Sequence, residues 1–412
     1  MKAEVKIYAK TIEQEAIDQI NTLVETGVFD DCNIRIMPDC HSGAGCVIGF
    51  TSRYKDKIIS NIQGVDICCG MLLSELSKKP DTKQLQETIE KNVPAGREIH
   101  ESTYFGGNVP KVFKERYRYI KEKILELRCY RNLKEAKKLP LAIGSLGGGN
   151  HFIELDYSEK TGKYYLVIHT GSRNLGKQVA DYYQTLAVKM LSGWDVIAKE
   201  QKELIERYKA EGRRTEIQEA IAELHRNFRQ HNPKLPRELC YLQGQDMEDY
   251  LHDAKICGEF ANLNRLMIRD EILLGFPDIE IGETFTTLHN YIGEDGIIRK
   301  GAVSAREGEK LIIPMNMRDG SLICVGKGNA DWNYSAPHGA GRLMSRTKAR
   351  EVLKMEDYKE DMKGIDTWSV SEGTIDEAPQ AYKPMQEIID CIEPTAEVID
   401  IIKPVYNFKA QG

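Results

Sequence analysis

Histidines are the side chains of this sequence best suited to chemistry near neutral pH, and their surroundings divide the nine of them into two groups. Four lie in polar or helical surroundings, where we expect surface or capping side chains: His100, His225, His231 and His252. The other five lie in or beside turn-rich segments or at strand ends, where sites are usually built on a rigid sheet: His41, His151, His169, His289 and His338.

A carboxylate and a thiol stand three residues apart in the stretch GVDICCGM. A tight turn can direct Asp66 and Cys69 to one point, while Cys68 faces elsewhere. Taken alone, this stretch is more economically read as two buried thiols beside a turn aspartate.

The histidines, the aspartate and the cysteine together indicate a metal site more strongly than any of them does alone. One Asp, one Cys and three His would offer oxygen, sulfur and nitrogen to transition metals: Asp66, Cys69, His151, His169 and His289. Imidazole and carboxylate suit manganese or zinc, and a thiolate can bridge two ions. Such a two-metal site could clamp a phosphate and activate an incoming hydroxyl.

His338 stands between a proline and glycines in NYSAPHGAGRLMSRTKAR, residues 333–350. A neutral imidazole is a good nucleophile toward phosphorus, and Gly339 lets the backbone approach phosphates. A helix that began there would direct free amides at them. Arg342, Arg346 and Arg350, at four-residue steps, would then form a stripe for further phosphates; the alternative is a solvated helix face.

Two other nucleotide signals are weaker. Residues 171–177, GSRNLGK, fit the first seven positions of a P-loop, but Gln178 lacks the hydroxyl that would hold magnesium. The Lys-x-Asp-Gly motif of ligases with a lysine nucleophile is absent. A covalently held nucleotide would therefore need another attacking atom.

Alternating strand-like and helical segments must position these residues. Thr11 and Gln14 have the spacing of a capping box, which predicts a first strand followed by a helix. Short β-branched runs predict strands at VIGFTS, KIIS, YYLVIHT, LIIP and SLICVG. The tail IIDCIEPTAEVIDIIKPVYNFK is expected to form short strands broken by Pro394 and Pro404.

The pattern of apolar residues becomes helical between residues 181 and 274, where Ile217, Ile221 and Leu224 recur among charged residues. We therefore predict an α/β (α+β) fold with mixed sheets, in which residues 1–412 form one domain and residues 181–274 a central helical insertion.

Composition bounds the class of protein. A chain of 412 residues can bury a core without disulfides, and its ten cysteines lack the spacing of a secreted framework, so we expect a reducing, cytoplasmic compartment. No signal peptide and no apolar run of membrane-spanning length is evident, which argues against a membrane protein. A net charge of -6 excludes a generally basic nucleic-acid coat, so any RNA or DNA contact would be focal.

Six motifs also occur in a familiar order: GVDICCGM, GGGNHFIE, HTGSRNLG, HNY, HGAGRLMSR and DEAPQAYK. Over essentially its whole length the chain resembles the RtcB family of GTP-dependent RNA-splicing ligases. The resemblance implies the family's own α/β fold and the joining of an RNA 3'-phosphate or 2',3'-cyclic phosphate end to a 5'-hydroxyl end. It also implies GTP and two Mn²⁺ ions.

The resemblance assigns roles residue by residue. It implies that Asp66, Cys69, His151, His169 and His289 hold two manganese ions with Cys69 bridging, and that His338 takes GMP. Residues that match nucleotide contacts are Asn150, Glu154 and Lys409, and Arg173 resembles a residue that holds the RNA phosphate. From their positions after His338, we also predict that Gly339 contacts the nucleotide and that Arg342 and Arg346 contact RNA.

The implied reaction has three steps. A cyclic phosphate is opened by metal-activated water, His338 takes GMP from GTP, and GMP passes to the RNA 3'-phosphate before the 5'-hydroxyl attacks. Two alternatives stay open: a nucleotidyltransferase that caps 3'-phosphate ends of RNA or DNA without joining them, and a non-enzymatic, metal-stabilised RNA-binding protein. The sequence identifies neither the RNA substrate, in tRNA splicing or RNA repair, nor whether an activating partner such as archease is needed.

Two places depart from the family pattern. After LIIP the chain reads Met315-Asn316-Met317-Arg318 where many members have small residues, which could change the preferred end. Cys68 stands where a glycine is common.

Overall fold

The computed structural model describes residues 1–227 and 233–410. The chain opens with β1 (Glu4–Ile7) and α1 (Gln14–Glu25), which confirms the predicted strand and helix. The predicted capping box does not form, because Glu13 occupies the N-cap of α1 and makes no side-chain cap. Its carboxylate instead accepts a hydrogen bond from the backbone N–H of Ser42 at 2.7 Å, so it ties α1 to the end of a strand.

The smaller of the two main sheets has five strands in the order β1-β2-β3-β11-β10. Its further strands are β2 (Asn33–His41), β3 (Ile48–Arg53), β10 (Tyr291–Ile292) and β11 (Ile297–Lys300). Only β1 and β2 are parallel; the other pairs are antiparallel. The predicted strand VIGFTS is thus confirmed as β3, whereas KIIS contributes only the two-residue β4 (Lys57–Ile58), which pairs with β8 (Leu242–Gln243).

The larger sheet follows the order β13-β14-β17-β6-β7-β5-β9, and neighbours along this path are antiparallel. Its strands are β5 (Gly70–Leu76), β6 (Phe152–Ser158), β7 (Tyr164–Thr170), β9 (Ile281–Leu288), β13 (Lys310–Asn316), β14 (Gly320–Gly326) and β17 (Ala396–Phe408). The predicted strands at YYLVIHT, LIIP and SLICVG lie within β7, β13 and β14. The short strands β12 (Ala302–Ser304) and β15 (Ser335–Pro337) pair separately, and β16 (Asp366–Thr367) adds to β17.

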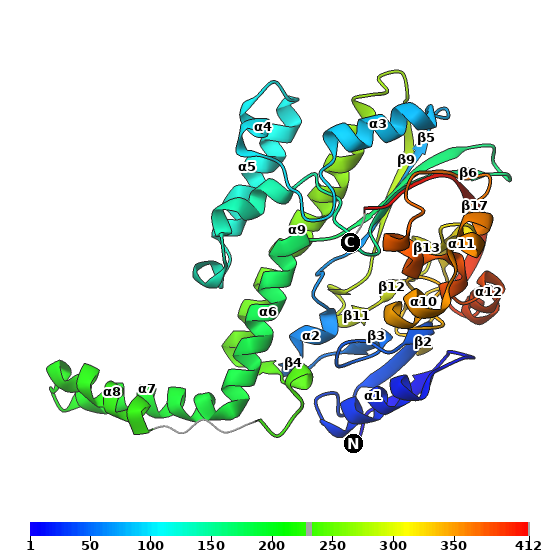
Figure 1. Cartoon of the computed structure of the whole chain (residues 1–412). Helices are drawn as coiled ribbons and strands as arrows, with labels where there is room; N and C mark the ends of the chain where they lie inside the picture. The colour runs from blue at the N-terminus through cyan, green and yellow to red at the C-terminus, as the bar shows by residue number, and fades with distance from the viewer. Residues whose placement is uncertain (228–232, 411–412) are drawn as a thin grey trace.

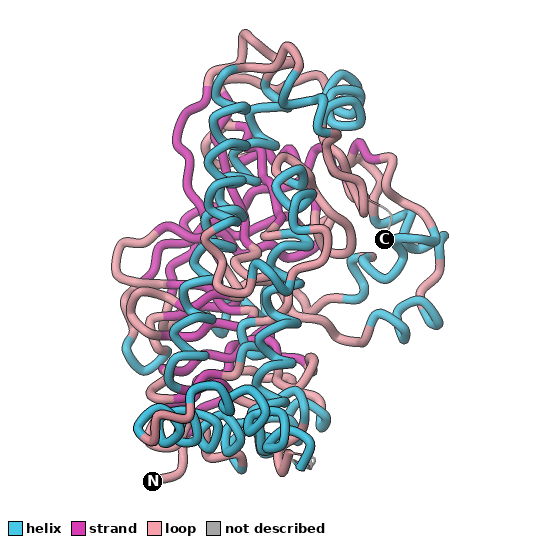
Figure 2. Tube along the Cα trace, turned by 90° about the vertical axis from the view of Figure 1, so that its left-hand side faces the viewer, coloured by secondary structure: helices cyan, strands magenta, loops and turns pink. Residues whose placement is uncertain are grey.

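Alternate residues of the larger sheet serve two different purposes. Ile153 and Leu155 of β6 and Ile168 of β7 pack against helices on one face of the sheet. Phe152 and Glu154 point from the opposite face into a cavity. The helices that cover the apolar face are chiefly α9 (Gly244–Leu273) and α3 (Thr82–Asn92). Figure 2 shows these helices in front of the strands.

The helical part of the chain begins earlier than predicted. Helices run from α6 (Arg173–Lys189) to the end of α9 at Leu273, rather than over residues 181–274. The difference arises because α6 starts directly behind the strand end and packs on α9, so its first turns belong to the core. Between them, α7 (Asp195–Ala210) and α8 (Ile217–Asn227) form an arm that extends away from the rest of the molecule (Figure 1).

The remaining helices are short except for α5, which packs beside α9. They are α2 (Ser60–Gln63), α4 (Ser102–Gly106), α5 (Lys111–Leu125), α10 (Arg346–Val352), α11 (Met355–Asp361) and α12 (Met385–Ile392). The fold is therefore of mixed α/β class, as predicted. The division into one domain with an insertion stays a prediction.

The predicted tail of short, broken strands is wrong in two respects. Its first part forms α12, whose buried Ile388, Cys391 and Ile392 lie at helical spacing. The rest forms the single long strand β17, which continues through Pro404. Pro404 has no N–H to donate to a neighbouring strand. A bulge between Pro404 and Tyr406 interrupts the pairing with β6 at this point, so the proline does not end the strand.

All ten cysteines are buried and free. Across the described ranges, the structure contains no helix that is both long and apolar enough to cross a membrane.

Candidate active site

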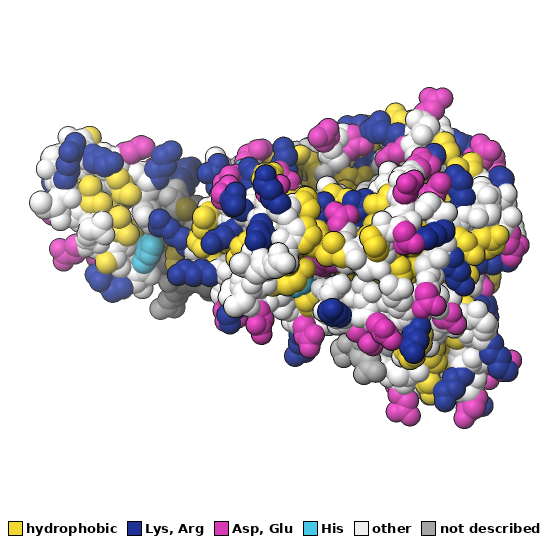
Figure 3. Space-filling view, turned by 90° about the horizontal axis from the view of Figure 1, so that it is seen from above, with side chains coloured by type: hydrophobic (Ala, Val, Ile, Leu, Met, Phe, Trp, Pro, Cys, Tyr) yellow, Lys and Arg dark blue, Asp and Glu magenta, His cyan; other side chains and the backbone are white. Residues whose placement is uncertain are grey.

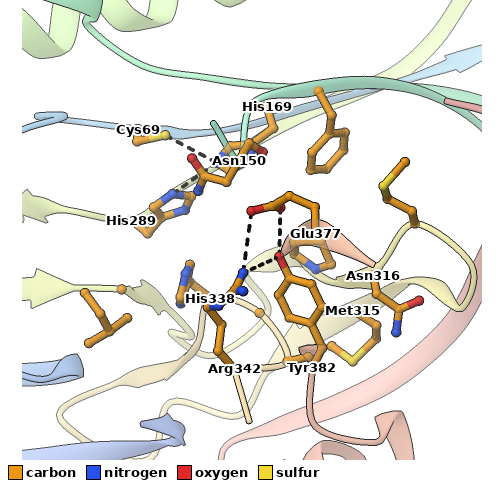
Figure 4. Close-up of a pocket in the computed structure, with 18 of the residues that line it drawn as sticks. Cys69, Asn150, His169, His289, Met315, Asn316, His338, Arg342, Glu377 and Tyr382 are labelled. Carbon is orange, nitrogen blue, oxygen red and sulfur yellow. Dashed lines mark hydrogen bonds and ion pairs between the residues drawn. The ribbon is translucent and has the colours of Figure 1, made fainter. Parts of the chain in front are cut away.

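Side chains from the ends of four neighbouring strands converge at one end of the larger sheet. Cys69 directly precedes β5, His151 directly precedes β6, His169 is the penultimate residue of β7, and His289 follows β9. Strand register aligns them, since His169 is opposite both Met71 in β5 and Phe152 in β6. Residues far apart in the sequence therefore meet because their strands are paired (Figure 4).

The five side chains predicted as metal ligands all lie in this cluster. Cys69 Sγ is 3.4 Å from His151 Nε2 and 3.2 Å from His169 Nε2. His169 Nε2 is 3.2 Å from His289 Nε2, and His151 Nε2 is 2.9 Å from Asp66 Oδ2. The cluster divides into two groups of three with Cys69 in both: Cys69, His169 and His289, and Asp66, Cys69 and His151.

The imidazoles are oriented with their Nε2 atoms toward the shared thiol. His151 Nδ1 is 2.9 Å from the carbonyl oxygen of Leu146, and His169 Nδ1 is 3.1 Å from that of Asn150. Because a carbonyl only accepts, Nδ1 of each ring carries a proton, and each Nε2 is directed at the cluster. Burial lowers the pKa of His169 well below its ordinary value, so this ring is neutral. Imidazole nitrogens, a thiol and a carboxylate in two groups of three fit divalent transition metals.

The loop that carries Asp66 is held by close backbone approach. The backbone N–H of Ser172 donates to Asp66 Oδ1 at 3.0 Å. A β-carbon on Gly171 would lie 2.3 Å from the same oxygen, so only glycine fits there. Cys68 has a φ of +57°, in the left-handed region that favours glycine, so a glycine at this position would fit the backbone.

Two buried residues of α9 support the metal-ligand loops from behind. Asn264 Oδ1 accepts from the backbone N–H groups of Gly144 and Ser145, and its amide donates to the carbonyl of Gly171 at 3.2 Å. The fully buried Arg265 donates to the carbonyls of Cys68 and Thr170 at 3.1 and 2.9 Å. α9 thereby fixes three loops relative to one another.

His338 lies on the opposite side of the same cavity, directly after β15. Its Nδ1 atom is 2.6 Å from Oδ2 of Asp39, a fully buried residue of β2, and its backbone N–H points to the same oxygen. The His338 and His289 rings are 4.9 Å apart, so the histidine faces the metal-ligand cluster. Gly341 permits this arrangement, since a β-carbon there would lie 2.4 Å from the carbonyl oxygen of Asp39.

The predicted helix directly after His338 is not present. α10 begins only at Arg346, capped by Ser345, so Arg342 lies in the preceding loop and no helix start points at the histidine. Nor do the three arginines form a free stripe, because each contacts the acidic pair at residues 376–377. Arg346 Nη1 is 2.9 Å from Asp376 and Arg350 Nη2 is 3.0 Å from it, while Arg342 Nη1 is 3.5 Å from Glu377.

Glu377 is the centre of a buried ion network at the cavity wall. Lys409 Nζ lies 2.6 Å and Arg346 Nη1 2.7 Å from its carboxylate, and the Tyr382 hydroxyl donates to it at 2.8 Å. Burial alone would raise the pKa of Glu377, but the charges of Lys409 and Arg346 outweigh it and lower the pKa to about 2. Three arginines and one lysine thus face two carboxylates, which leaves this wall positive.

Glu154 lies at the far end of the cavity, beside β17. Asn407 Nδ2 donates to its carboxylate at 2.6 Å, and burial raises the pKa of Glu154 to about 7. Behind it, Asp156 is fully buried and neither of its oxygens has a hydrogen-bond partner. Burial and the neighbouring Glu154 raise the pKa of Asp156 well above its usual range, so it stays protonated.

One cavity of about 290 Å³ connects these groups. The predicted site residues that line it are Asp66, Cys69, Asn150, Glu154, His169, His289, His338, Gly339, Arg342, Arg346 and Lys409. His151 lies in the cluster behind this lining. Arg173 is also outside the lining, where it donates to Ser145 Oγ at 3.0 Å and to the carbonyl of Gly96 at 2.8 Å.

A model of the tRNA-splicing ligase RtcB family matches residues 23–410. The chain belongs to the RtcB family. RNA-splicing ligase RtcB of Escherichia coli K12 is 30% identical over 424 aligned residues, which cover 94% of this chain and 92% of that protein. tRNA-splicing ligase RtcB of Methanococcus maripaludis is 28% identical and covers 86% of this chain and 82% of its own length.

The segment 315–318, which was expected to influence the preferred RNA end, lines the cavity in part. Met315 and Met317 are buried and, with Asn316, belong to its lining. Tyr358 donates a hydrogen bond to Met317 Sδ at 3.2 Å, which holds the segment in place. Arg318 turns away to Asp361 and does not line the cavity. This segment therefore contributes to the cavity wall through Met315, Asn316 and Met317 and not through Arg318.

Of the remaining histidines, His41 lines the cavity, whereas His100, His225, His252 and the P-loop candidate do not. His100 was predicted at the surface but is buried, with Nε2 3.1 Å from Glu271, because its segment packs under α9. His225 is exposed and His252 half-buried, whereas His231 falls outside the described residues. Residues 171–177 form no P-loop, since α6 is helical from Arg173 onward.

Sequence reasoning missed the residues that orient the reactive groups. Asp39 lies two residues before His41 in β2, where most residues, Asp39 included, are buried. A carboxylate in such a strand was the sequence signal that could have identified it. Asn264 and Arg265 are polar residues at fully buried positions of α9. Glu377 belongs to the motif DEAPQAYK, but its role as a counter-ion depends on contacts that spacing does not reveal.

Proposed function

We propose that this protein is an RNA ligase that joins RNA ends bearing a 3'-phosphate or 2',3'-cyclic phosphate to 5'-hydroxyl ends, through GMP held covalently on His338. The observation that carries the proposal is the Asp39–His338 contact of 2.6 Å beside the His/Cys cluster. Asp39 occupies Nδ1 and so leaves Nε2 as the free nucleophilic atom in the cavity. Membership of the RtcB family supports the same activity.

In the first chemical step, the Nε2 lone pair of His338 would attack the α-phosphorus of GTP. A nitrogen–phosphorus bond forms, the bond from the α-phosphorus to the β-phosphate oxygen breaks, and pyrophosphate leaves. The carboxylate of Asp39 stabilises the positive charge that develops on the imidazole. The fixed orientation of the ring removes a rotational search before attack.

In the next steps, an oxygen of the RNA 3'-phosphate would attack the phosphorus of the bound GMP and release His338. The 5'-hydroxyl of the second RNA then attacks the activated 3'-phosphate, so that a phosphodiester bond forms, GMP leaves and the hydroxyl proton is lost. We propose that Arg342 and Arg346 of the positive wall bind phosphate oxygens during these transfers.

We propose that two Mn²⁺ ions are held here, one by Asp66, Cys69 and His151 and the other by Cys69, His169 and His289. When bound, such ions would neutralise charge on phosphoryl oxygens as Lewis acids. The protein's own part is to hold the Nε2 atoms of His151 and His169 toward the ions, because the carbonyls of Leu146 and Asn150 orient the two rings.

The nucleotide would lie between His338 and Glu154. Gly339, Asn150, Glu154 and Lys409 line this cavity, and we propose that Glu154 accepts from the guanine base and Lys409 donates to it. Arg173 is proposed to hold the RNA phosphate, since among the described residues it has no carboxylate within ion-pair distance. We assign the activity to the cytoplasm, in tRNA splicing or RNA repair.

A ligation assay tests the proposal with two short RNAs, one ending in a 3'-phosphate and one beginning with a labelled 5'-hydroxyl. With GTP and Mn²⁺, wild type should give a product of the summed length, and His338→Ala should give none. RNA that ends in GMP without joining would instead support the capping alternative. RNA binding without either product, equal in wild type and His338→Ala, would support the non-enzymatic alternative.

A further inference from the structure

One segment of this acidic protein is strongly basic. Residues 111–138 contain eleven Lys and Arg and only four Glu, whereas the whole chain has a net charge of -6. The segment comprises α5 and the short 3-10 helices η1 (Tyr130–Asn132) and η2 (Ala136–Ala142). Figure 3, which looks down on the molecule, shows Lys and Arg gathered between the arm and the body, where α5 lies in Figure 1.

Most of these cations have no partner in the folded protein. Four of the eleven make ion pairs, for example Arg116 with Asp270 at 2.6 Å and Lys138 with Glu135 at 2.6 Å. Among the described residues, no carboxylate lies within 4.0 Å of the other seven. This differs from Arg342, Arg346 and Arg350, which all pair with acidic side chains.

Three of the unpaired cations form a stripe on α5. Lys114, Arg118 and Lys121 are spaced at i, i+4 and i+7, so they lie on one side of the helix. The core side is different, since it carries Phe113 and Ile120. Arg118 and Lys121 are exposed, and Lys114 is half-buried. The stripe therefore presents charge to solvent and not to another element.

The other four unpaired cations surround η1 and η2 and connect the stripe to the active site. They are Arg128, Arg131, Lys134 and Lys137, and all are exposed. The backbone N–H of Lys134 donates to Gln178 Oε1 at 2.6 Å. Gln178 lies on α6 five residues after Arg173, or roughly 8 Å along the helix axis. The residue before Arg173 is Ser172, whose N–H binds Asp66.

We propose that this basic surface, from Lys114 on α5 to Lys137 on η2, binds the phosphate backbone of the RNA whose end is processed at His338. The inference rests on the proposed function and extends it, because it names where the RNA lies beyond the cavity. Unpaired, mobile cations without an aligned set of base-reading side chains favour contacts to phosphates that are independent of base sequence. The arm is not suited to this role, since its basic and acidic residues balance from residue 199 to residue 226.

Salt dependence of RNA affinity tests the surface directly. The probe is a fluorescent 20-nucleotide RNA with a 3'-phosphate, titrated at several KCl concentrations. We compare wild type with the triple variant Arg131→Gln, Lys134→Gln, Lys137→Gln. Loss of three phosphate contacts should weaken binding about tenfold and make the log–log salt slope shallower by about 2. Because the three residues are exposed and unpaired, the variant should fold normally, which thermal unfolding checks.

A matched control removes three exposed, unpaired lysines from the arm: Lys199→Gln, Lys202→Gln and Lys209→Gln. It should retain wild-type affinity within about twofold and an unchanged slope. Unchanged affinity and slope in the first variant, or an equal loss in the control, would overturn the proposal. So would a variant that keeps its RNA affinity but loses binding to anionic lipid vesicles, which would assign the surface to a membrane.

Two further readouts separate this proposal from the proposed function. Formation of the GMP adduct needs no RNA, so it should be equal in wild type and in both triple variants. Absence of the adduct in wild type would contradict the proposed function while the binding slopes still decide on the surface. If a trinucleotide with a 3'-phosphate is held by the cavity alone, its affinity should be the same for the first variant as for wild type.

Discussion

His338 Nδ1 lies 2.6 Å from Oδ2 of Asp39, and Asp39 is fully buried in β2. A buried carboxylate at this distance fixes both the tautomer and the rotation of the imidazole. The reactivity of the proposed nucleophile therefore depends on a residue from a different sheet and nearly three hundred positions away in the sequence.

We predict that Asp39→Asn slows formation of the GMP adduct by ~100-fold or more. Asparagine can rotate its amide toward Nδ1, which would move the proton to Nε2 and block the attacking atom. Single-turnover adduct formation measures the effect. Manganese content should stay at the wild-type level, and a variant that lost metal as well would contradict a role confined to His338.

Two neighbouring cysteines offer a matched test of the metal site. Cys69→Ala should lose metal, because its Sγ belongs to both ligand groups. Cys68→Ala should retain it, since Cys68 is not in either group. Elemental analysis after dialysis against Mn²⁺ gives the number of ions per chain. Equal metal content in the two variants would contradict the bridging position of Cys69.

The raised pKa of Glu154 predicts a pH dependence of GTP binding. Burial raises this pKa to about 7, and guanine offers N–H donors that a carboxylate accepts better than its protonated form. GTP affinity should therefore rise as pH increases through about 7, and Glu154→Gln should flatten the profile. Asp156→Asn is the control, because Asp156 stays protonated and an amide mimics it. A wild-type profile that is flat from pH 6 to 8 would contradict this role.

Removing the central carboxylate of the ion network should destabilise the fold. Glu377→Gln leaves buried cations uncompensated, so we expect a loss of about 3–5 kcal/mol in the free energy of unfolding at pH 7. Because the folded pKa of about 2 is below the ordinary 4.5, the stabilisation is complete above pH 4.5 and is lost as pH falls through 2. Denaturant unfolding at pH 7 and pH 3 measures it. A GTP concentration that saturates the site should restore part of the loss, since phosphates replace the carboxylate.

A control for this variant is Glu360→Gln, which breaks an exposed pair with Lys363. Exposed pairs contribute little, so its unfolding free energy should change by less than about 1 kcal/mol. An equally small effect of Glu377→Gln would show that Glu377 does not stabilise the fold as the counter-charge of Lys409 and Arg346.

Several strands could be predicted from the sequence because a short β-branched run is local information, and these strands are buried along most of their length. β3, β7, β13 and β14 follow from short β-branched runs. The tail could not be predicted in the same way, since IIDCI fits a buried helix and a strand equally well. Pro404 was expected to end a strand because it has no N–H to donate. A bulge next to it interrupts the pairing in any case, so the strand continues through the proline.

The candidate site, too, could be predicted only in part from the sequence. Cys69, His151, His169 and His289 could be grouped from residue type and turn context, and strand pairing brings them together. The positions of the arginines could not be foreseen, because a four-residue spacing predicts a shared helix face only if the helix begins early enough. α10 begins at Arg346, and the acidic residues that neutralise the stripe lie some thirty positions later in the chain.

The most direct test of the central claim is the intact mass of the purified protein after incubation with GTP and Mn²⁺, followed by mapping of any modified residue. We predict one added GMP per chain on wild type, located on His338, and none on His338→Ala. No adduct on a wild-type sample that holds its full complement of manganese, or an adduct that persists in His338→Ala, would contradict a histidine nucleophile at this position.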